Sequence, residues 1–232
     1  MVTSKVFLFA ISVILLSSLS VSVFAATPVT VGPNNPTTAA NIAGANADWA
    51  NPTNVFSSNN IRSTSATLNG GTPTTDLLVA KNFTFNIPTG VTIQGIAVSV
   101  ERSSTATAKD LSVNLTKDGS TVVGTNLLNA TNWETTDRIS TYGGSSNLWG
   151  TTWTPAEINS ANFGLAFAAQ RVGASPSPAI DHITITVTYI DDIAPTPGAH
   201  IAPVNGTSVN INPTLTWNNP TDTVALAATP YV

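Results

Sequence analysis

Two histidines could act as a catalytic base, and neither lies in a setting typical of nucleophilic catalysis. They are His182 and His200, and an activated hydroxyl needs such a base within hydrogen-bonding reach. His182 is expected to point to solvent, because it shares the phase of Thr184 and Thr186 in an alternating strand. Residues 143–146 lack the Gly-x-Ser-x-Gly spacing of a nucleophile elbow. We therefore expect no acyl-transfer site.

Paired carboxylates are the other arrangement that could support hydrolysis, here of glycosidic bonds. The candidates are Glu101, Glu134, Asp137 and Glu157. Glu157 is accounted for by a helix cap and Glu101 by the outward phase of its strand, while Glu134 and Asp137 are expected to be solvated loop acids. The sequence thus predicts that the protein is not an enzyme.

Metal-ligand chemistry is restricted by the absence of cysteine and by the presence of only two histidines, which leaves no zinc site of the usual kind. Calcium stays open, because carboxylates and loop carbonyls can supply about six or more oxygens at one end of a β-sandwich. The candidate ligands are Asp110, Asp118 and Asp181, although no calcium-loop spacing is present. Asp181 has an alternative role, which is to fix a loop by accepting backbone N–H bonds.

Four aromatic residues cluster in the least regular stretch of the chain: Trp133, Tyr142, Trp149 and Trp153. If their faces are exposed, they could hold sugar rings by stacking. The alternative is that Trp149 and Trp153 close an open end of the fold, each burying roughly 150–250 Å². Trp49 is expected to anchor an N-terminal arm in the same way.

The elements that position these residues are predicted to be strands, because helix formers are scarce and β-branched residues recur. Alternation of apolar and polar residues indicates strands with one face on a core and one face on solvent. Such alternation is found in residues 83–87, 96–101, 111–116, 163–167 and 183–189. We therefore predict an all-β fold.

Turn signals separate the strands. Residues 117–120, which contain Asp118-Gly119, predict a hairpin from residues 111–116 to 121–125. Thr154 and Glu157 form a capping box with Pro155 at the first helical position, so one helical turn is expected there. With weaker segments near 54–57 and 65–69, about eight strands precede residue 190, enough for a jelly-roll-like antiparallel β-sandwich.

Residues 1–25 predict a secretory signal peptide, with Lys5, an apolar run, and small residues before a cleavage site after Ala25. An uncleaved membrane anchor is the alternative. After cleavage no segment is expected to span a membrane, and the predicted location is secreted or cell-surface. The net charge of −4 argues against nucleic acid as a partner.

Residues 191–197 predict a linker, because two acids and two prolines cannot continue a strand. The predicted organisation is a sandwich over residues 26–190, followed by the start of a second β-domain over 198–232. An immunoglobulin-like sandwich needs about 100 residues. We therefore expect that the sequence is partial or that another chain supplies the missing strands.

Ordered motifs over residues 49–189 give a resemblance to a known kind of module. They are Phe83-Thr84-Phe85-Asn86-Ile87-Pro88, residues 93–101, Leu148-Trp149-Gly150, Trp153-Thr154-Pro155, Asn162-Phe163-Gly164 and residues 180–189. This set resembles a jelly-roll-like module of bacterial secreted or surface proteins and phage structural proteins. Leu215-Thr216-Trp217, Pro220 and Tyr231 are similar to the B and C strands of a fibronectin type III-like or immunoglobulin-like domain, which implies core positions for Trp217 and Tyr231.

These observations favour a non-catalytic structural or adhesive module of a secreted or cell-surface multidomain protein. One alternative is a carbohydrate-binding module that uses the loop aromatics, with a glycan or other surface proteins as partners. Another is a filament or coat subunit, in which the nearly uncharged residues 26–60 add a strand to a neighbour's edge.

Overall fold

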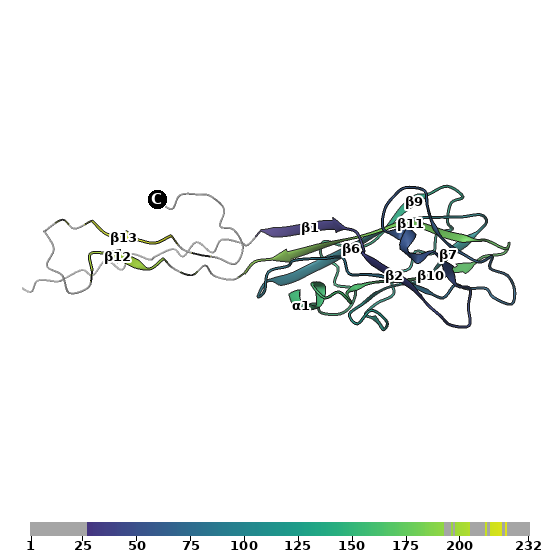
Figure 1. The fold of residues 1–232 in the computed structure, drawn as a ribbon, viewed down its shortest axis with the longest axis horizontal. Helices are drawn as coiled ribbons and strands as arrows, with labels where there is room; N and C mark the ends of the chain where they lie inside the picture. The colour runs from purple at the N-terminus through teal and green to yellow at the C-terminus, as the bar shows by residue number, and fades with distance from the viewer. Residues whose placement is uncertain are drawn as a thin grey trace, which may run out of the picture.

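The structure is a computed structural model that describes residues 27–192, 196, 198–204, 212, 214–219 and 221. Within residues 27–192 the strands form two facing antiparallel sheets, which confirms the predicted all-β sandwich. The first sheet contains, in order, β3 (Trp49–Ala50), β4 (Ser63–Ser65), β11 (Pro178–Ile190), β6 (Thr92–Ser104) and β9 (Arg138–Gly144), and β1 (Pro28–Asn34) also pairs with β11. The second contains β2 (Thr38–Ile42), β5 (Leu77–Lys81), β10 (Gly164–Arg171), β7 (Ala108–Thr116) and β8 (Val122–Val123). Figure 1 shows the two layers.

The core lies between the sheets and is built by the alternating strands. Ile96, Val98 and Val100 of β6 are fully buried, as are Ile185 of β11 and Leu165 of β10, and all five belong to one apolar cluster. The strands predicted at 96–101 and 183–189 are therefore confirmed. Each such side chain contributes roughly 1.5–3 kcal/mol by leaving water.

Two segments differ from the strands predicted for them. Residues 83–87 bury Phe83, Phe85 and Ile87 but form no strand. Asn82 and Thr84 have positive φ angles, and these interrupt the extended backbone that a strand needs. Side-chain amides take the place of a strand partner, as where Asn159 donates to the carbonyl of Ile87 and accepts from its N–H, both at 2.8 Å. Residues 54–57, in turn, overlap a 3-10 helix, η1 (Pro52–Val55), instead of a strand.

A bulge in β7 reverses the phase that the sequence predicted for its first half. Ala168 of β10 pairs with Ser112, but the next residue pairs with Asp110, so Leu111 is the extra residue. Leu111 was expected to face the core and is only half-buried, whereas Asp110 is fully buried. Bulges re-aim side chains in this way, and this one turns a carboxylate inward.

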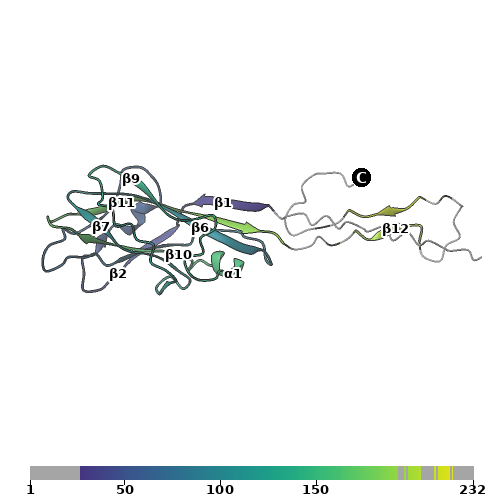
Figure 2. The same cartoon turned by 180° about the vertical axis from the view of Figure 1, so that it is seen from behind.

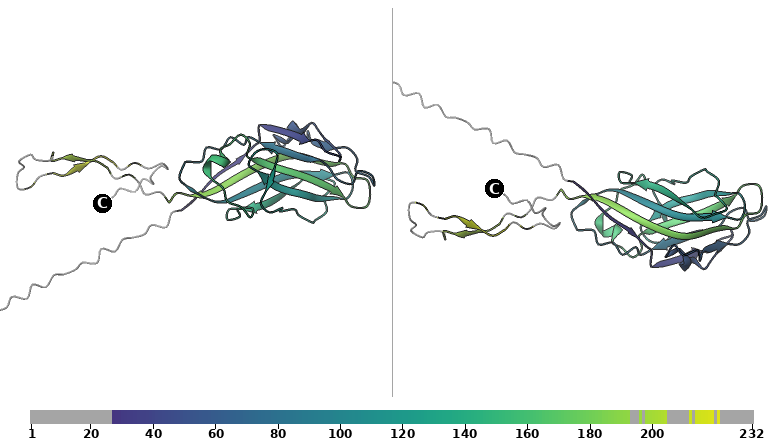
Figure 3. Two further views of the ribbon diagram at one scale, coloured as in Figure 1. Left: turned by 90° about the horizontal axis from the view of Figure 1, so that it is seen from below. Right: turned by 90° about the horizontal axis from the view of Figure 1, so that it is seen from above.

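The chain enters and leaves the sandwich at the same end, because Pro28 of β1 pairs with Ile190 of β11. We call this the entry end, and Figures 1 and 2 show α1 (Pro155–Ile158) on the same side. The opposite end, which we call the loop end, lies where Ser104 pairs with Pro178 and Arg138 with Arg102. Figure 3 shows the long strands running between the two ends.

Aromatic packing and a helix cap close the entry end. Thr154 and Glu157 exchange hydrogen bonds as predicted, at 3.2 and 2.8 Å. The buried Trp149 donates from Nε1 to the carbonyl of Ile96 at 2.9 Å. At Gly143, where φ is 70°, a Cβ atom would collide with that carbonyl and with the Trp149 ring, so only glycine fits.

The N-terminal segment is used within the chain. Residues 28–34 pair with β11 and residues 38–42 with β5, so these two parts of segment 26–60, which the filament hypothesis considered for strand addition to a neighbour, are paired within the chain in this structure. Trp49 is buried, and its Nε1 donates to the carbonyl of Asp76 at 2.9 Å, which confirms its anchoring role.

Beyond residue 192, β12 (His200–Ala202) pairs with β13 (Thr216–Trp217). Trp217 is 56% exposed and meets His200 edge-on, whereas the resemblance implied a core position. The predicted signal peptide, Pro220 and Tyr231 lie outside the described residues. Among the described residues no helix is long and apolar enough to cross a membrane.

Candidate functional site at the loop end

A buried polar network lies under the loop end and centres on Asp110. Its carboxylate accepts hydrogen bonds from Trp133 Nε1 at 2.8 Å, from Tyr142 Oη at 2.9 Å and from the backbone N–H of Asn129 at 2.8 Å. Burial, and then the negative charge of Asp110, raise the pKa of Tyr142 above its usual range, so Tyr142 stays a neutral donor. The carboxylate of Asp110 is therefore surrounded by hydrogen-bond donors.

Arg102 supplies the opposite charge. Its side chain is 4% exposed, its Nε lies 3.5 Å from Asp110 Oδ1, and the same Nε donates to Tyr142 Oη at 3.1 Å. The guanidinium carbon lies 4.6 Å from the centre of the Trp133 ring, a cation–π contact. Among the described residues, Nη1 and Nη2 have no hydrogen-bond acceptor. The two terminal nitrogens of this buried arginine, which carry four N–H donors, are thus unpaired among the described residues.

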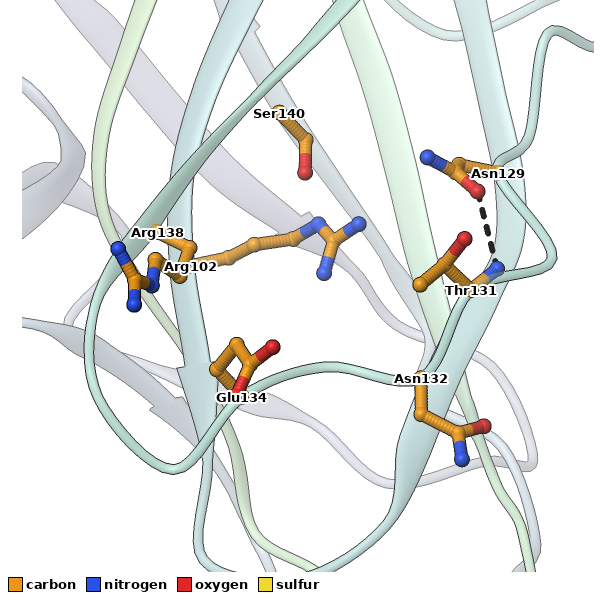
Figure 4. A pocket seen from close by; sticks show the side chains of 7 residues that line it. All are labelled: Arg102, Asn129, Thr131, Asn132, Glu134, Arg138 and Ser140. Atoms are coloured by element: carbon orange, nitrogen blue, oxygen red, sulfur yellow. Dashed lines mark hydrogen bonds between the residues drawn. The ribbon is translucent and has the colours of Figure 1, made fainter.

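Those donors line a pocket of about 190 Å³. The lining residues are Arg102, Asn129, Thr131, Asn132, Glu134, Arg138 and Ser140. Figure 4 shows the two arginines and Glu134 on one side and Asn129, Thr131 and Asn132 on the other. With two guanidinium groups, one carboxylate and otherwise amides and hydroxyls, the lining has a formal charge of +1. Such a surface suits a small polar ligand that carries a carboxylate.

The aromatic residues predicted to bind a ligand do not form a stacking surface. Trp133, Tyr142, Trp149 and Trp153 are at most 7% exposed, so none presents a free face to a sugar ring. Trp149 and Trp153 instead belong to the entry end, where Trp153 packs edge-on against Phe163 at 5.3 Å. Trp133 and Tyr142 lie beneath the loop-end pocket as donors to Asp110. The structure therefore separates the four residues into two groups.

The three predicted calcium ligands are also separated. Asp110 is occupied by the network above, and Asp118 holds its own hairpin by accepting from the backbone N–H groups of Ser120 at 2.8 Å and Thr121 at 2.6 Å. These bonds lower the pKa of Asp118 far below its ordinary value. Asp181 accepts from the N–H groups of Asn59 and Asn60, both at 3.1 Å, as its alternative role predicted.

Asp181 joins two acids that the metal prediction did not include. Carboxylate oxygens of Glu101, Asp137 and Asp181 all lie within 4.8 Å of one another. Arg62 pairs with Asp137 through Nε, 3.0 Å from each carboxylate oxygen. This pairing, with a bond from Ser103 at 2.7 Å, lowers the pKa of Asp137 despite its partial burial. Asp137 was expected to be a solvated loop acid and is instead 10% exposed and paired.

The two histidines lie in different surroundings. His182 is half-buried, on the outer face of β11, and its Nε2 lies 3.0 Å from Asn35 Oδ1. Burial lowers the pKa of His182, although Glu101 and Asp181 act in the opposite direction. His200 is exposed in β12. Neither is hydrogen-bonded to a serine or threonine hydroxyl among the described residues.

The arginines are what the sequence reasoning missed. Arg102 extends the even-numbered phase of Ile96, Val98 and Val100 in β6, so the alternation itself placed a charge on the core side. That signal was available in the sequence. Arg62 and Arg138 come from a loop and from the first residue of β9, and no local pattern placed them.

No protein-family model matches this chain, and a search of curated proteins finds no match to it.

Proposed function

We propose that the chain is a non-catalytic adhesive module of a secreted or cell-surface multidomain protein and that it engages its partner with the loop end. The observation that carries this proposal is the pairing of Pro28 with Ile190. Because the first strand of the sandwich begins and its last strand ends at the entry end, the chain continues toward residue 200 from that end, and the loop end is free to face outward. Its polar pocket provides a surface for the contact.

Charge reversal at the two ends tests the proposal. Beads coated with the full chain are expected to adhere to a surface that carries bacterial or host polysaccharide, and Arg138→Glu at the loop end is expected to reduce adhesion several-fold. Lys81→Glu near the entry end is the matched control, since Lys81 pairs with Gly164 at the opposite end of the sheet. Equal losses in both variants, or no adhesion by the wild type, would contradict the proposal.

A carbohydrate-binding module is the second candidate, and one observation favours a particular form of it. Arg102 holds unused donors beside a second arginine and four amide or hydroxyl side chains, so the favoured ligand is an acidic sugar, not a neutral one. This replaces the stacking mechanism, which needs exposed rings. Arginine matches a carboxylate geometrically, because its donors form a planar fork.

Titration calorimetry with galacturonate, glucose and sulfate separates the ligand classes. We expect galacturonate to bind, glucose not to bind, and sulfate to bind more weakly, because it lacks the hydroxyls that the amides would recognise. Arg138→Gln is expected to weaken galacturonate binding by roughly tenfold, the effect of one lost charge-assisted contact. Lys81→Gln is the control. Equal affinity for glucose would exclude the acidic-sugar candidate.

A further inference from the structure

A cluster of three acids lies at the loop end, on the outer face of the first sheet, and none of its members lines the pocket described above. Glu101 leaves β6 on the face opposite to Arg102, and Asp181 is the extra residue of a bulge in β11 between Ile180 and His182. Asp137 lies just before β9. Their carboxylate oxygens are within 4.8 Å of one another. Three segments far apart in sequence therefore bring three acids to one point.

The charge at this point is not balanced. The cation bound to this group is Arg62, which pairs with Asp137. Three carboxylates and one guanidinium leave a formal charge of −2. Close like charges are costly without a cation between them.

One oxygen of the group also lacks a donor. Asp181 is 1% exposed, and while its Oδ2 accepts two backbone N–H bonds, its Oδ1 has no hydrogen-bond partner among the described residues. A buried carboxylate oxygen without a donor is destabilising, because it has lost its contacts with water and gained no hydrogen bond. A bound cation would remove this cost. Neither the bulge in β11 nor the contact with Asn59 provides a partner for Oδ1.

We propose that Glu101, Asp137 and Asp181 form a calcium site. Calcium binds oxygens at about 2.3–2.6 Å, so two of its ligands can lie up to about 5 Å apart, and the cluster fits within that span. The amide oxygen of Asn60 and the hydroxyl of Ser103 are close by, since they contact Arg62 and Asp137 respectively. Arg62, whose side chain is partly exposed, competes with the ion for Asp137.

Calorimetric titration of calcium into the full, chelator-treated chain tests the site. We expect one ion per chain with an affinity in the range of extracellular modules, about 0.1–1 mM, and a rise in Tm with calcium. Glu101→Gln is expected to weaken binding by roughly tenfold or more, because ligand charge sets calcium affinity. Asp181→Asn should do the same. If that buried variant fails to fold, the calcium affinity of the partly exposed Glu101→Gln variant still tests the site.

Two variants sharpen the test. Arg62→Gln is expected to tighten calcium binding, since it removes the competing cation, whereas a purely structural role for the acids predicts no binding in any variant. Glu134→Gln is the matched control, an exposed acid at the same end outside the cluster. Absence of calcium heat and of a Tm change up to about 10 mM would overturn the proposal, and so would an equal loss of affinity in Glu134→Gln.

Discussion

The two ends of the sandwich are closed by different chemistry. At the entry end, aromatic rings and a capped helical turn fill the gap between the sheets, with Trp149 and Phe163 fully buried. At the loop end, the same gap holds the ion pair of Arg102 and Asp110, and acids gather on the outer face. Among the described residues, the entry end is thus closed without a buried ion pair. The charges at the loop end are the feature on which the binding proposals depend.

The largest effect is expected at the entry end. Trp149→Ala removes a fully buried ring and its hydrogen bond to Ile96, so the free energy of unfolding should fall by about 3–5 kcal/mol. Urea unfolding measures this. Trp217→Ala is the matched control, because Trp217 is more than half exposed. Similar losses in the two variants would contradict the assignment of Trp149 as the plug of this end.

The loop-end ion pair should come next. Asp110→Asn leaves Arg102 without its counter-ion and turns an amide donor toward groups that already donate to Asp110. We expect a loss of about 3 kcal/mol, the lower end for a broken buried pair, because the arginine opens into a pocket. Adding Arg102→Met should restore part of the loss in urea unfolding. A double variant no more stable than Asp110→Asn would mean that the charges are not coupled.

The helix cap should matter less. Thr154→Ala removes the side-chain acceptor for the N–H of Glu157 and should lower the free energy of unfolding by about 1 kcal/mol. Thr154→Ser, which keeps the hydroxyl, is the control for thermal or urea unfolding. A loss of the same size in the serine variant would show that the methyl group, not the cap, is responsible.

The smallest effect concerns pH. The pKa of Asp137 is lower in the folded protein than the ordinary value, chiefly through its bond to Arg62, so its contribution is present above about pH 4 and is lost as pH falls through the folded pKa. A partly exposed pair contributes at most about 1 kcal/mol. Urea unfolding at pH 6 and pH 3 should show that the gap between wild type and Arg62→Gln narrows at the lower pH. If the difference in unfolding free energy between the two proteins were larger at pH 3 than at pH 6, the proposed link between the pKa of Asp137 and stability would be wrong.

The sequence predicted the parts of this contrast that depend on periodicity and local caps. The strands around Val98 and Ile185 followed from alternation, and the turn at Thr154 followed from its cap. Alternation could not predict the two β-bulges, which change the face on which nearby side chains lie. One extra residue at Leu111 turned Asp110 inward, and another at Asp181 placed that residue beside acids from two other segments.

The candidate site was predicted only in part. The sequence analysis named Asp181, Trp133 and Tyr142 as candidates, but the partners that they have in the structure come from distant segments, and alternation contains no information about such contacts. The strand predicted at residues 83–87 was wrong for a related reason. The N–H of Ile87 is hydrogen-bonded to the side chain of Asn159, which lies far along the chain. Only Arg102, on the core phase of β6, could have been identified from local pattern alone.

Amide shifts in a nuclear magnetic resonance titration of the full, isotope-labelled chain with galacturonate test the contrast between the ends most directly. We predict shift changes confined to residues 129–140 and Arg102, with residues 145–163 at the entry end unaffected. Shift changes centred on residues 145–163, or no shift changes at a large excess of galacturonate, would contradict the assignment of the loop end as the binding end.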